Sequence, residues 1–267
     1  MSVIDCHLAA IDLDGTLLDS EYQLCEENRQ TVQKLAEKGV IVVLASGRMH
    51  ETILPFSRRI HLNDPIISYN GAMAKDVKTG ELLHHIPIPS NLAKKMITYC
   101  ANRNLHLNFY LDDVLYVRER NKWSELYDNR TGATSNPVGD LHRFDGDEPT
   151  KLQIVDSPQN IDRFLIEFNN LFKDELYITK TQPEYLEFMN PSVSKGSALI
   201  AVAGRLRVSM AKVVAFGDGY NDMSLMEAAG FRVAMGNSID EIKTCADYIT
   251  STNDENGVAA AIKELLL

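Results

Sequence analysis

The stretch His7-Leu-Ala-Ala-Ile-Asp-Leu-Asp-Gly-Thr16 joins a short apolar run to two carboxylates and a glycine. A continuous apolar run of this length is typical of a strand buried on both faces of a parallel sheet. The glycine lets the chain turn sharply directly after the strand. We therefore expect Asp12 and Asp14 at the carboxyl end of a buried strand, the edge at which open α/β sheets bind their ligands.

Outward from this stretch, helical and strand patterns alternate. Val32, Leu35 and Ala36 lie on one stripe of a helix expected over residues 26–38, and Gly39 supplies its stop. The patterns that follow predict a strand over 40–44, a short helix over 53–60, a strand over 65–68 and a hairpin turn at 70–71. This order favours β-α-β units in a parallel sheet.

Between residues 86 and 188 the regular alternation of helices and strands stops. We expect helices over 91–103 and 160–172, strands over 106–110, 114–117, 151–155 and 186–189, and an exposed loop excursion over 129–149. The α/β pattern then resumes, with helices over 195–206, from 221 and up to 267, and strands over 213–216 and 231–234. The prediction is a doubly wound, mostly parallel, Rossmann-like α/β core of residues 1–85 and 189–267 with an inserted α+β cap over 86–188.

Composition narrows the class of protein. The chain has 267 residues, 45% of them apolar, which is enough for a packed core. Its net charge of −10, without any Lys/Arg block, argues against nucleic acid as a partner. The longest charge-free apolar run is far shorter than the roughly 20 residues of a membrane span, and no secretory signal is visible. We expect a cytoplasmic protein without a membrane partner, and we assign its four scattered cysteines no chemistry.

Asp12 and Asp14 are two residues apart, so both can face one site. Like charges this close repel each other, and a cation that prefers oxygen ligands, Mg²⁺ above all, would hold them together. The alternative is a plain turn at a strand end, because Asp and Gly are common turn formers.

Two further segments carry groups that suit a phosphate. Ser46-Gly47-Arg48 follows the second strand, where a hydroxyl and backbone N–H groups can hold a phosphate oxygen, although a capped turn is the alternative. Lys195 opens a helix, where the dipole disfavours a cation, and its charge could neutralise a bound phosphoryl group. Taken alone, Lys195 is better explained as a solvated surface lysine.

The sharpest signal is Phe216-Gly-Asp-Gly-Tyr-Asn-Asp222, which ends a strand and opens a helix. It places two carboxylates and an amide within five residues. We expect Asp218 to bind the metal, and Asn221 and Asp222 to be further ligands or to orient the ligands. A glycine loop with an Asn/Asp helix cap is the alternative.

Together, and in this order, these four segments resemble the motifs of the haloacid dehalogenase superfamily of phosphohydrolases, in its Cof-type branch with a large α+β cap. The resemblance spans essentially the whole chain. It implies that Asp12 is the nucleophile, while Asp14 protonates the leaving oxygen and later activates water.

The same resemblance implies a Mg²⁺ cofactor held by Asp12, the backbone carbonyl of Asp14 and Asp218, with Asn221 and Asp222 in support. The residues expected to bind the phosphoryl group are Leu13, Ser46, Gly47, Lys195 and Asn221.

The substrate is expected to be a small phosphorylated metabolite, such as a sugar phosphate or a nucleotide or cofactor phosphate. Arg48, Asn70 and Lys151 are candidates for contacting its leaving group, and surface solvation or a turn explains each of them equally well. A phosphosugar mutase and a non-catalytic phosphometabolite-binding protein are the alternatives, the latter disfavoured because every reactive carboxylate is in place. The oligomeric state stays open.

Overall fold

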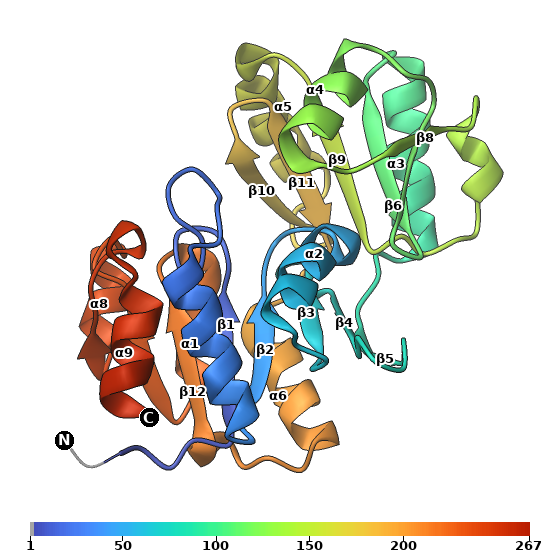
Figure 1. Ribbon diagram of the computed structural model, residues 1–267. Coiled ribbons are helices and arrows are strands. Elements are labelled where there is room, and N and C mark those ends of the chain that lie inside the picture. The colour runs from blue at the N-terminus through green and yellow to red at the C-terminus, as the bar shows by residue number, and fades with distance from the viewer. Residues whose placement is uncertain (1–2) are drawn as a thin grey trace. The chain divides into compact units, whose positions relative to one another are not determined.

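The computed structural model describes residues 3–267. They form two compact units. Residues 3–84 and Ser194–Leu267 make up the first, here called the core unit, and His85–Val193 make up the second, the inserted unit. The core unit is therefore assembled from two separate stretches of the chain (Figure 1).

The sheet of the core unit brings the N-terminal and C-terminal stretches together. Its strands run in the order β14 (Tyr248–Ile249), β13 (Phe231–Ala234), β12 (Val213–Gly217), β1 (Leu8–Asp12), β2 (Ile41–Ala45), β3 (Ile66–Ser68), β4 (Met73–Lys75) and β5 (Leu82–His85). The first strand, β1, pairs in parallel with β12 on one side and β2 on the other. The carboxyl ends of these three buried strands therefore meet at one edge.

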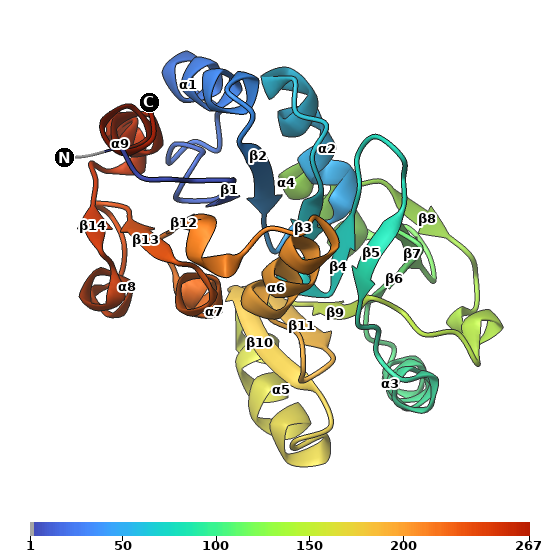
Figure 2. The ribbon, with the colours of Figure 1, turned by 90° about the horizontal axis from the view of Figure 1, so that it is seen from below.

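Helices cover both faces of this sheet (Figure 2). One face carries α1 (Glu26–Glu37), α2 (His50–Ile60) and α9 (Gly257–Leu265), and the other carries α6 (Lys195–Arg205), α7 (Met223–Ala228) and α8 (Asp240–Cys245). Because successive strand residues point to opposite faces, Ala9 and Ile11 pack under the first set and Leu8 and Ala10 under the second. The predicted doubly wound, mostly parallel α/β core is confirmed.

The inserted unit is built on a sheet of its own. The strand order is β10 (Tyr177–Gln182), β11 (Tyr185–Met189), β9 (Lys151–Val155), β6 (Leu107–Leu111), β7 (Val114–Val117) and β8 (Ser135–Pro137). Apolar residues on one face pack against α3 (Ser90–Asn102) and α5 (Pro158–Leu171). On the other face, the Tyr127 ring from α4 (Lys122–Thr131) contacts the rings of Tyr110 and Tyr185. The unit is α+β, as the sequence predicts.

Parts of the sequence prediction were wrong in detail. The expected loop excursion over 129–149 contains the end of α4, the strand β8 and the 3₁₀ turn Leu141–Phe144. The side chain of Asn121 caps α4 by accepting from the backbone N–H groups of Trp123 and Ser124. Since β8 is a three-residue edge strand with the sequence Ser-Asn-Pro, it carries no apolar alternation that a pattern could detect.

The C-terminal stretch contains the expected last helix, but two further elements precede it. The chain leaves α8 after Cys245 and adds β14 to the edge of the sheet, parallel to β13. Only then does α9 begin, at Gly257. The helix expected from residue 221 starts instead with the 3₁₀ turn Tyr220–Asp222, which leads into α7. Within residues 3–267, no helix combines the length and apolarity that crossing a membrane requires.

Candidate active site

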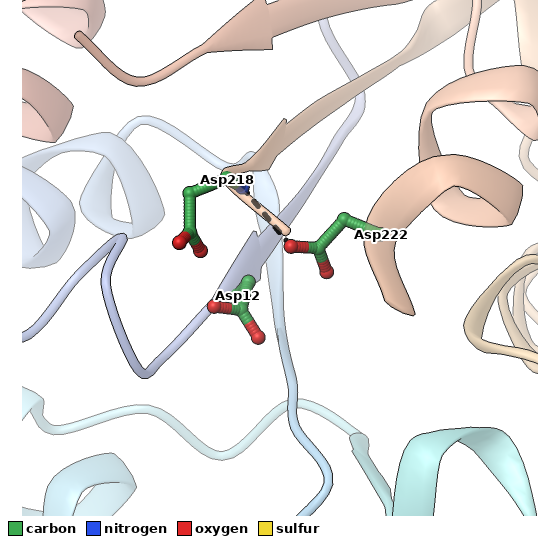
Figure 3. Close-up of side chains that lie close together, drawn as sticks. All are labelled: Asp12, Asp218 and Asp222. Carbon is green, nitrogen blue, oxygen red and sulfur yellow. Dashed lines mark hydrogen bonds between the residues drawn. The ribbon is translucent and has the colours of Figure 1, made fainter. Parts of the chain in front are cut away.

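The acidic residues of the first and fourth motifs converge at the carboxyl edge of the core sheet. Asp12 is the last residue of β1, and Asp218 directly follows β12. Figure 3 shows their carboxylates turned toward that of Asp222, which comes from the turn before α7. One oxygen of each carboxylate lies within 4.8 Å of the other two. The pairing of β1 with β12 brings these groups together from positions about two hundred residues apart.

Lys195 lies against this cluster and is completely buried. Its Nζ is 2.5 Å from Asp12 Oδ1 and 2.7 Å from Asp222 Oδ1. Although burial lowers the pKa of Lys195, the two carboxylates raise it by more, so the ammonium stays charged. The interpretation of Lys195 as a surface lysine is therefore wrong.

The packing of α6 against α7 explains how a lysine at a helix start becomes buried. A Cβ at Gly196 would lie 2.1 Å from the carbonyl oxygen of Ser224 in α7. Only glycine permits this approach, which brings the first turn of α6 onto the sheet edge. The side chain of Ser194 caps α6 by accepting from the N–H of Ser197.

The electrostatics of the carboxylate cluster favour a further cation. Burial and the nearby charge of Asp222 raise the pKa of Asp12 well above its usual range, and the same two causes raise the pKa of Asp218 to about 6. A single ammonium does not balance three carboxylates in a buried site. A divalent cation would do so, and an all-oxygen set of ligands fits Mg²⁺ better than zinc, which prefers nitrogen and sulfur.

The three carboxylates are not equivalent. Asp222 accepts through Oδ2 from the backbone N–H groups of Asp218 and Gly219, and through Oδ1 from Lys195. Both of its oxygens are thus engaged by the protein. Gly217 makes this possible, because a Cβ there would lie 2.6 Å from Asp222 Cβ. Asp12 and Asp218 are therefore the better candidates for direct metal ligands, and Asp222 for holding the loop that positions Asp218.

Asp14 lies beside the cluster and has a different partner. The Arg48 Nε donates to Asp14 Oδ2 at 2.8 Å, and its Nη2 donates to Asp14 Oδ1. Arg48 was predicted as a leaving-group contact; the structure joins it instead to the predicted acid and base of the reaction. About a third of the Asp14 side chain is exposed.

The remaining predicted residues of the core unit also gather at this edge. The Ser46 hydroxyl accepts from the N–H of Arg48 at 3.1 Å. The Asn70 side chain accepts from Asn221 Nδ2 at 3.2 Å and lies so close to Gly47 that a Cβ there would be 2.9 Å from it. The side chain of Leu13 is buried in the core, so any contact with phosphate would fall to its backbone. Their phosphate-binding roles stay predictions.

Thr16 was missed as a site residue. Its hydroxyl donates to Asp218 Oδ1 at 3.0 Å, which links the first motif directly to the fourth. The sequence could have indicated this role, because Thr16 is the last residue of the first motif. Two aromatic neighbours of Arg48, Tyr22 and Phe56, were also missed, and nothing in their local sequence marks them.

Lys151 lies in the inserted unit, within a buried polar network of that unit. Its Nζ is 3.1 Å from Glu187 Oε1, and the two side chains are 2% and 8% exposed. Glu187 also accepts from Gln153, which in turn accepts from Asn108. The Nζ lies 4.8 Å from the centre of the Tyr110 ring. The solvated-surface explanation for Lys151 is therefore wrong, and its role toward substrate stays a prediction.

We expect Glu187→Ala to lower the free energy of unfolding by about 3–5 kcal/mol, because it leaves the buried Lys151 ammonium without its carboxylate. Urea unfolding measures this change. Glu119→Ala is the matched control in the same unit, since Glu119 and its partner Arg118 are largely exposed and such pairs contribute about 1 kcal/mol or less. Equal losses in the two variants would contradict the prediction.

Comparison with known proteins gives a consistent result. A family model described as haloacid dehalogenase-like hydrolase matches residues 9–262. The chain is 32% identical over 272 residues to a 5-amino-6-(5-phospho-D-ribitylamino)uracil phosphatase of Bacillus subtilis, covering 99% of this chain and 97% of the relative. It is 30% identical to the phosphatase YwpJ of the same organism, covering 97% and 99%. The crystal structure of TM0651 from Thermotoga maritima superposes with a TM-score of 0.91 at 31% identity, covering 98% of both chains.

Proposed function

Because the chain belongs to the haloacid dehalogenase-like hydrolases and is a phosphoric monoester hydrolase, we propose that it hydrolyses small phosphorylated metabolites through a phosphoryl group carried on Asp12. The observation that carries this proposal is the position of Asp12 at the end of β1, with the charged Lys195 at 2.5 Å and Asp218 alongside. An anionic substrate can approach a carboxylate nucleophile only where fixed positive charge offsets their repulsion.

The proposed reaction has two steps. In the first, an Asp12 oxygen attacks phosphorus, the bond from phosphorus to the leaving oxygen breaks, and Asp14 gives that oxygen a proton. In the second, Asp14 takes a proton from water, whose oxygen attacks phosphorus, and the bond to Asp12 breaks to release phosphate. Lys195 offsets the charge of the phosphoryl oxygens in both steps.

Mg²⁺ is the proposed cofactor, held by Asp12, Asp218 and the backbone carbonyl of Asp14, with Asp222 and Asn221 in support. When bound, it would screen the nucleophile from the negative charge of the substrate. The raised pKa values of Asp12 and Asp218 support this, because they show that the ionised cluster is costly without a further cation.

The names of the relatives support the substrate class. At least one of them acts on a phosphate ester of a ribityl-substituted uracil. We include that compound, sugar phosphates, flavin mononucleotide and pyridoxal phosphate in the proposed range. The inserted unit is proposed to act as the cap, predicted over 86–188, that selects among them. Lys151 of this unit and Asn70 of the core unit are the residues to examine for contact with the leaving group.

Phosphate release from this panel tests the proposal, first with Mg²⁺ and then with EDTA. We expect chelation to lower the rate by more than about 100-fold, because a catalytic metal contributes several kcal/mol to the barrier, and added Mg²⁺ to restore it. Equal rates of phosphate release with Mg²⁺ and with EDTA would show that the reaction does not need a metal ion. Isomer formation without phosphate release would favour a mutase, and no turnover of any compound would favour a binding protein.

A further inference from the structure

Arg48 and Asp14 form a two-point contact at the edge of the candidate site. The Nε and Nη2 of Arg48 each donate to a different oxygen of Asp14. Such bidentate pairs fix the plane of the carboxylate as well as its position. Because only about a quarter of the Arg48 side chain and a third of the Asp14 side chain are exposed, solvent weakens this pair less than a fully exposed one.

Two aromatic rings lie near the guanidinium of Arg48. The Cζ of Arg48 lies 5.7 Å from the centre of the Tyr22 ring and 5.5 Å from that of Phe56. Both distances are within the range of a cation–π contact. Tyr22 has a backbone φ of +60°, a conformation that a bulky residue rarely adopts. Arg48 is thus supported from two separate segments, the turn after β1 and helix α2.

We propose that Arg48 is a positioning residue that fixes the Asp14 carboxylate for proton transfer, and that Tyr22 and Phe56 fix Arg48. This inference rests on the proposed function, in which Asp14 gives a proton in the first step and takes one in the second. Both transfers need the carboxyl group in hydrogen-bond reach of an oxygen close to phosphorus. An arginine side chain does not give up protons in proteins, so Arg48 acts through Asp14.

A lysine at position 48 would not replace this arrangement. An ammonium is a single point of charge on a flexible stem, whereas the guanidinium presents a planar fork. Residue 48 therefore has to supply two separate properties, a positive charge and a planar pair of donors. Arg48→Lys keeps the first and removes the second.

The experiment compares Arg48→Ala and Arg48→Lys with wild type on two substrates, an alkyl phosphate and p-nitrophenyl phosphate. Nitrophenolate leaves without a proton, whereas an alkoxide needs one. With the alkyl phosphate we expect kcat to fall roughly 100-fold in both variants, the lower end of what general acid catalysis contributes, and KM to change little. With p-nitrophenyl phosphate the loss should be smaller, because only the second step, in which Asp14 takes a proton from water, still needs the positioned carboxylate. Guanidinium ion in the buffer should restore part of the activity of Arg48→Ala.

Arg232→Ala is the matched control. Arg232 makes the same two-point contact with Asp247 in the same unit, through Nε at 2.9 Å and Nη2 at 3.1 Å, with side chains exposed by 36% and 33%. We expect this variant to keep the wild-type kcat on both substrates. A loss equal to that of Arg48→Ala would show that breaking a two-point pair acts through stability, which would overturn the proposal.

A double mutant separates positioning from other roles. If Arg48 acts only through Asp14, adding Arg48→Ala to Asp14→Asn should cause no further loss with p-nitrophenyl phosphate. A further loss as large as that of the single mutant, or a raised KM at unchanged kcat, would show that Arg48 binds substrate directly and would overturn the proposal. A failure of the proposed function can be told apart from a failure of this inference. If the proposed function were wrong, Asp12→Asn would leave phosphate release unchanged.

Discussion

Asp12→Asn is expected to abolish phosphate release, with a loss of kcat of at least about 10⁴-fold, because removal of a covalent nucleophile leaves only binding and charge stabilisation. Asparagine keeps the shape of the side chain and its contact oxygen. The folded state should therefore persist, and circular dichroism with thermal unfolding checks that it does. Phosphate release measured on the best substrate of the panel gives the size of the loss.

Asp64→Asn provides the control for this substitution. Asp64 is a partly buried carboxyl in the same unit whose Oδ2 accepts from the N–H of Val42, away from the carboxylate cluster. We expect this variant to keep its activity. A residual rate in Asp12→Asn within tenfold of wild type would mean that another group attacks phosphorus, and the mechanism would have to be abandoned.

Lys195→Met is expected to have the largest combined effect on stability and activity. It removes the ammonium that lies between Asp12 and Asp222, both of which are buried. Breaking a buried ion pair by removing one partner costs about 3–5 kcal/mol. The activity should fall at least about 100-fold as well, because the phosphoryl oxygens lose a fixed positive charge.

Urea unfolding with and without Mg²⁺ measures this effect. The cation should restore part of the lost stability, since it binds the folded state and offsets the same carboxylates. Lys263→Met is the control, because Lys263 and its partner Glu27 are half exposed and such a pair contributes about 1 kcal/mol or less. An unfolding free energy for Lys195→Met equal to that of the control would contradict the assignment of Lys195 as the counter-charge of the cluster.

The strands that build the site could be predicted because each is a continuous apolar run bounded by polar residues. For β2 and β12, the predicted and observed bounds differ by one residue at most. The positions of Asp12 and Asp218 at the ends of strands could be predicted from these strand bounds. The local sequence pattern was sufficient here, because a strand that is buried on both faces needs apolar residues along its whole length.

The partners of the charged residues could not be predicted in the same way. The burial of Lys195 depends on the contact of Gly196 with Ser224, which is a tertiary property. Likewise, the pairing of Arg48 with Asp14 joins two motifs that the sequence presents separately. A residue's type and its place in a helix indicate what it can do, whereas its partner is decided by which segments the sheet brings side by side.

The strand order of the core unit also has a consequence during synthesis of the chain. The neighbours of β1 in the sheet are β2, which follows it closely, and β12, whose residues begin at Val213. At about 5–20 residues per second, roughly 10–40 s pass between the emergence of β1 and that of β12 from a ribosome. During this time one edge of an apolar strand has no partner and is exposed to pairing with other chains. The inserted unit is complete before β12 arrives, whereas the sheet of the core unit keeps this open edge until its second half is made.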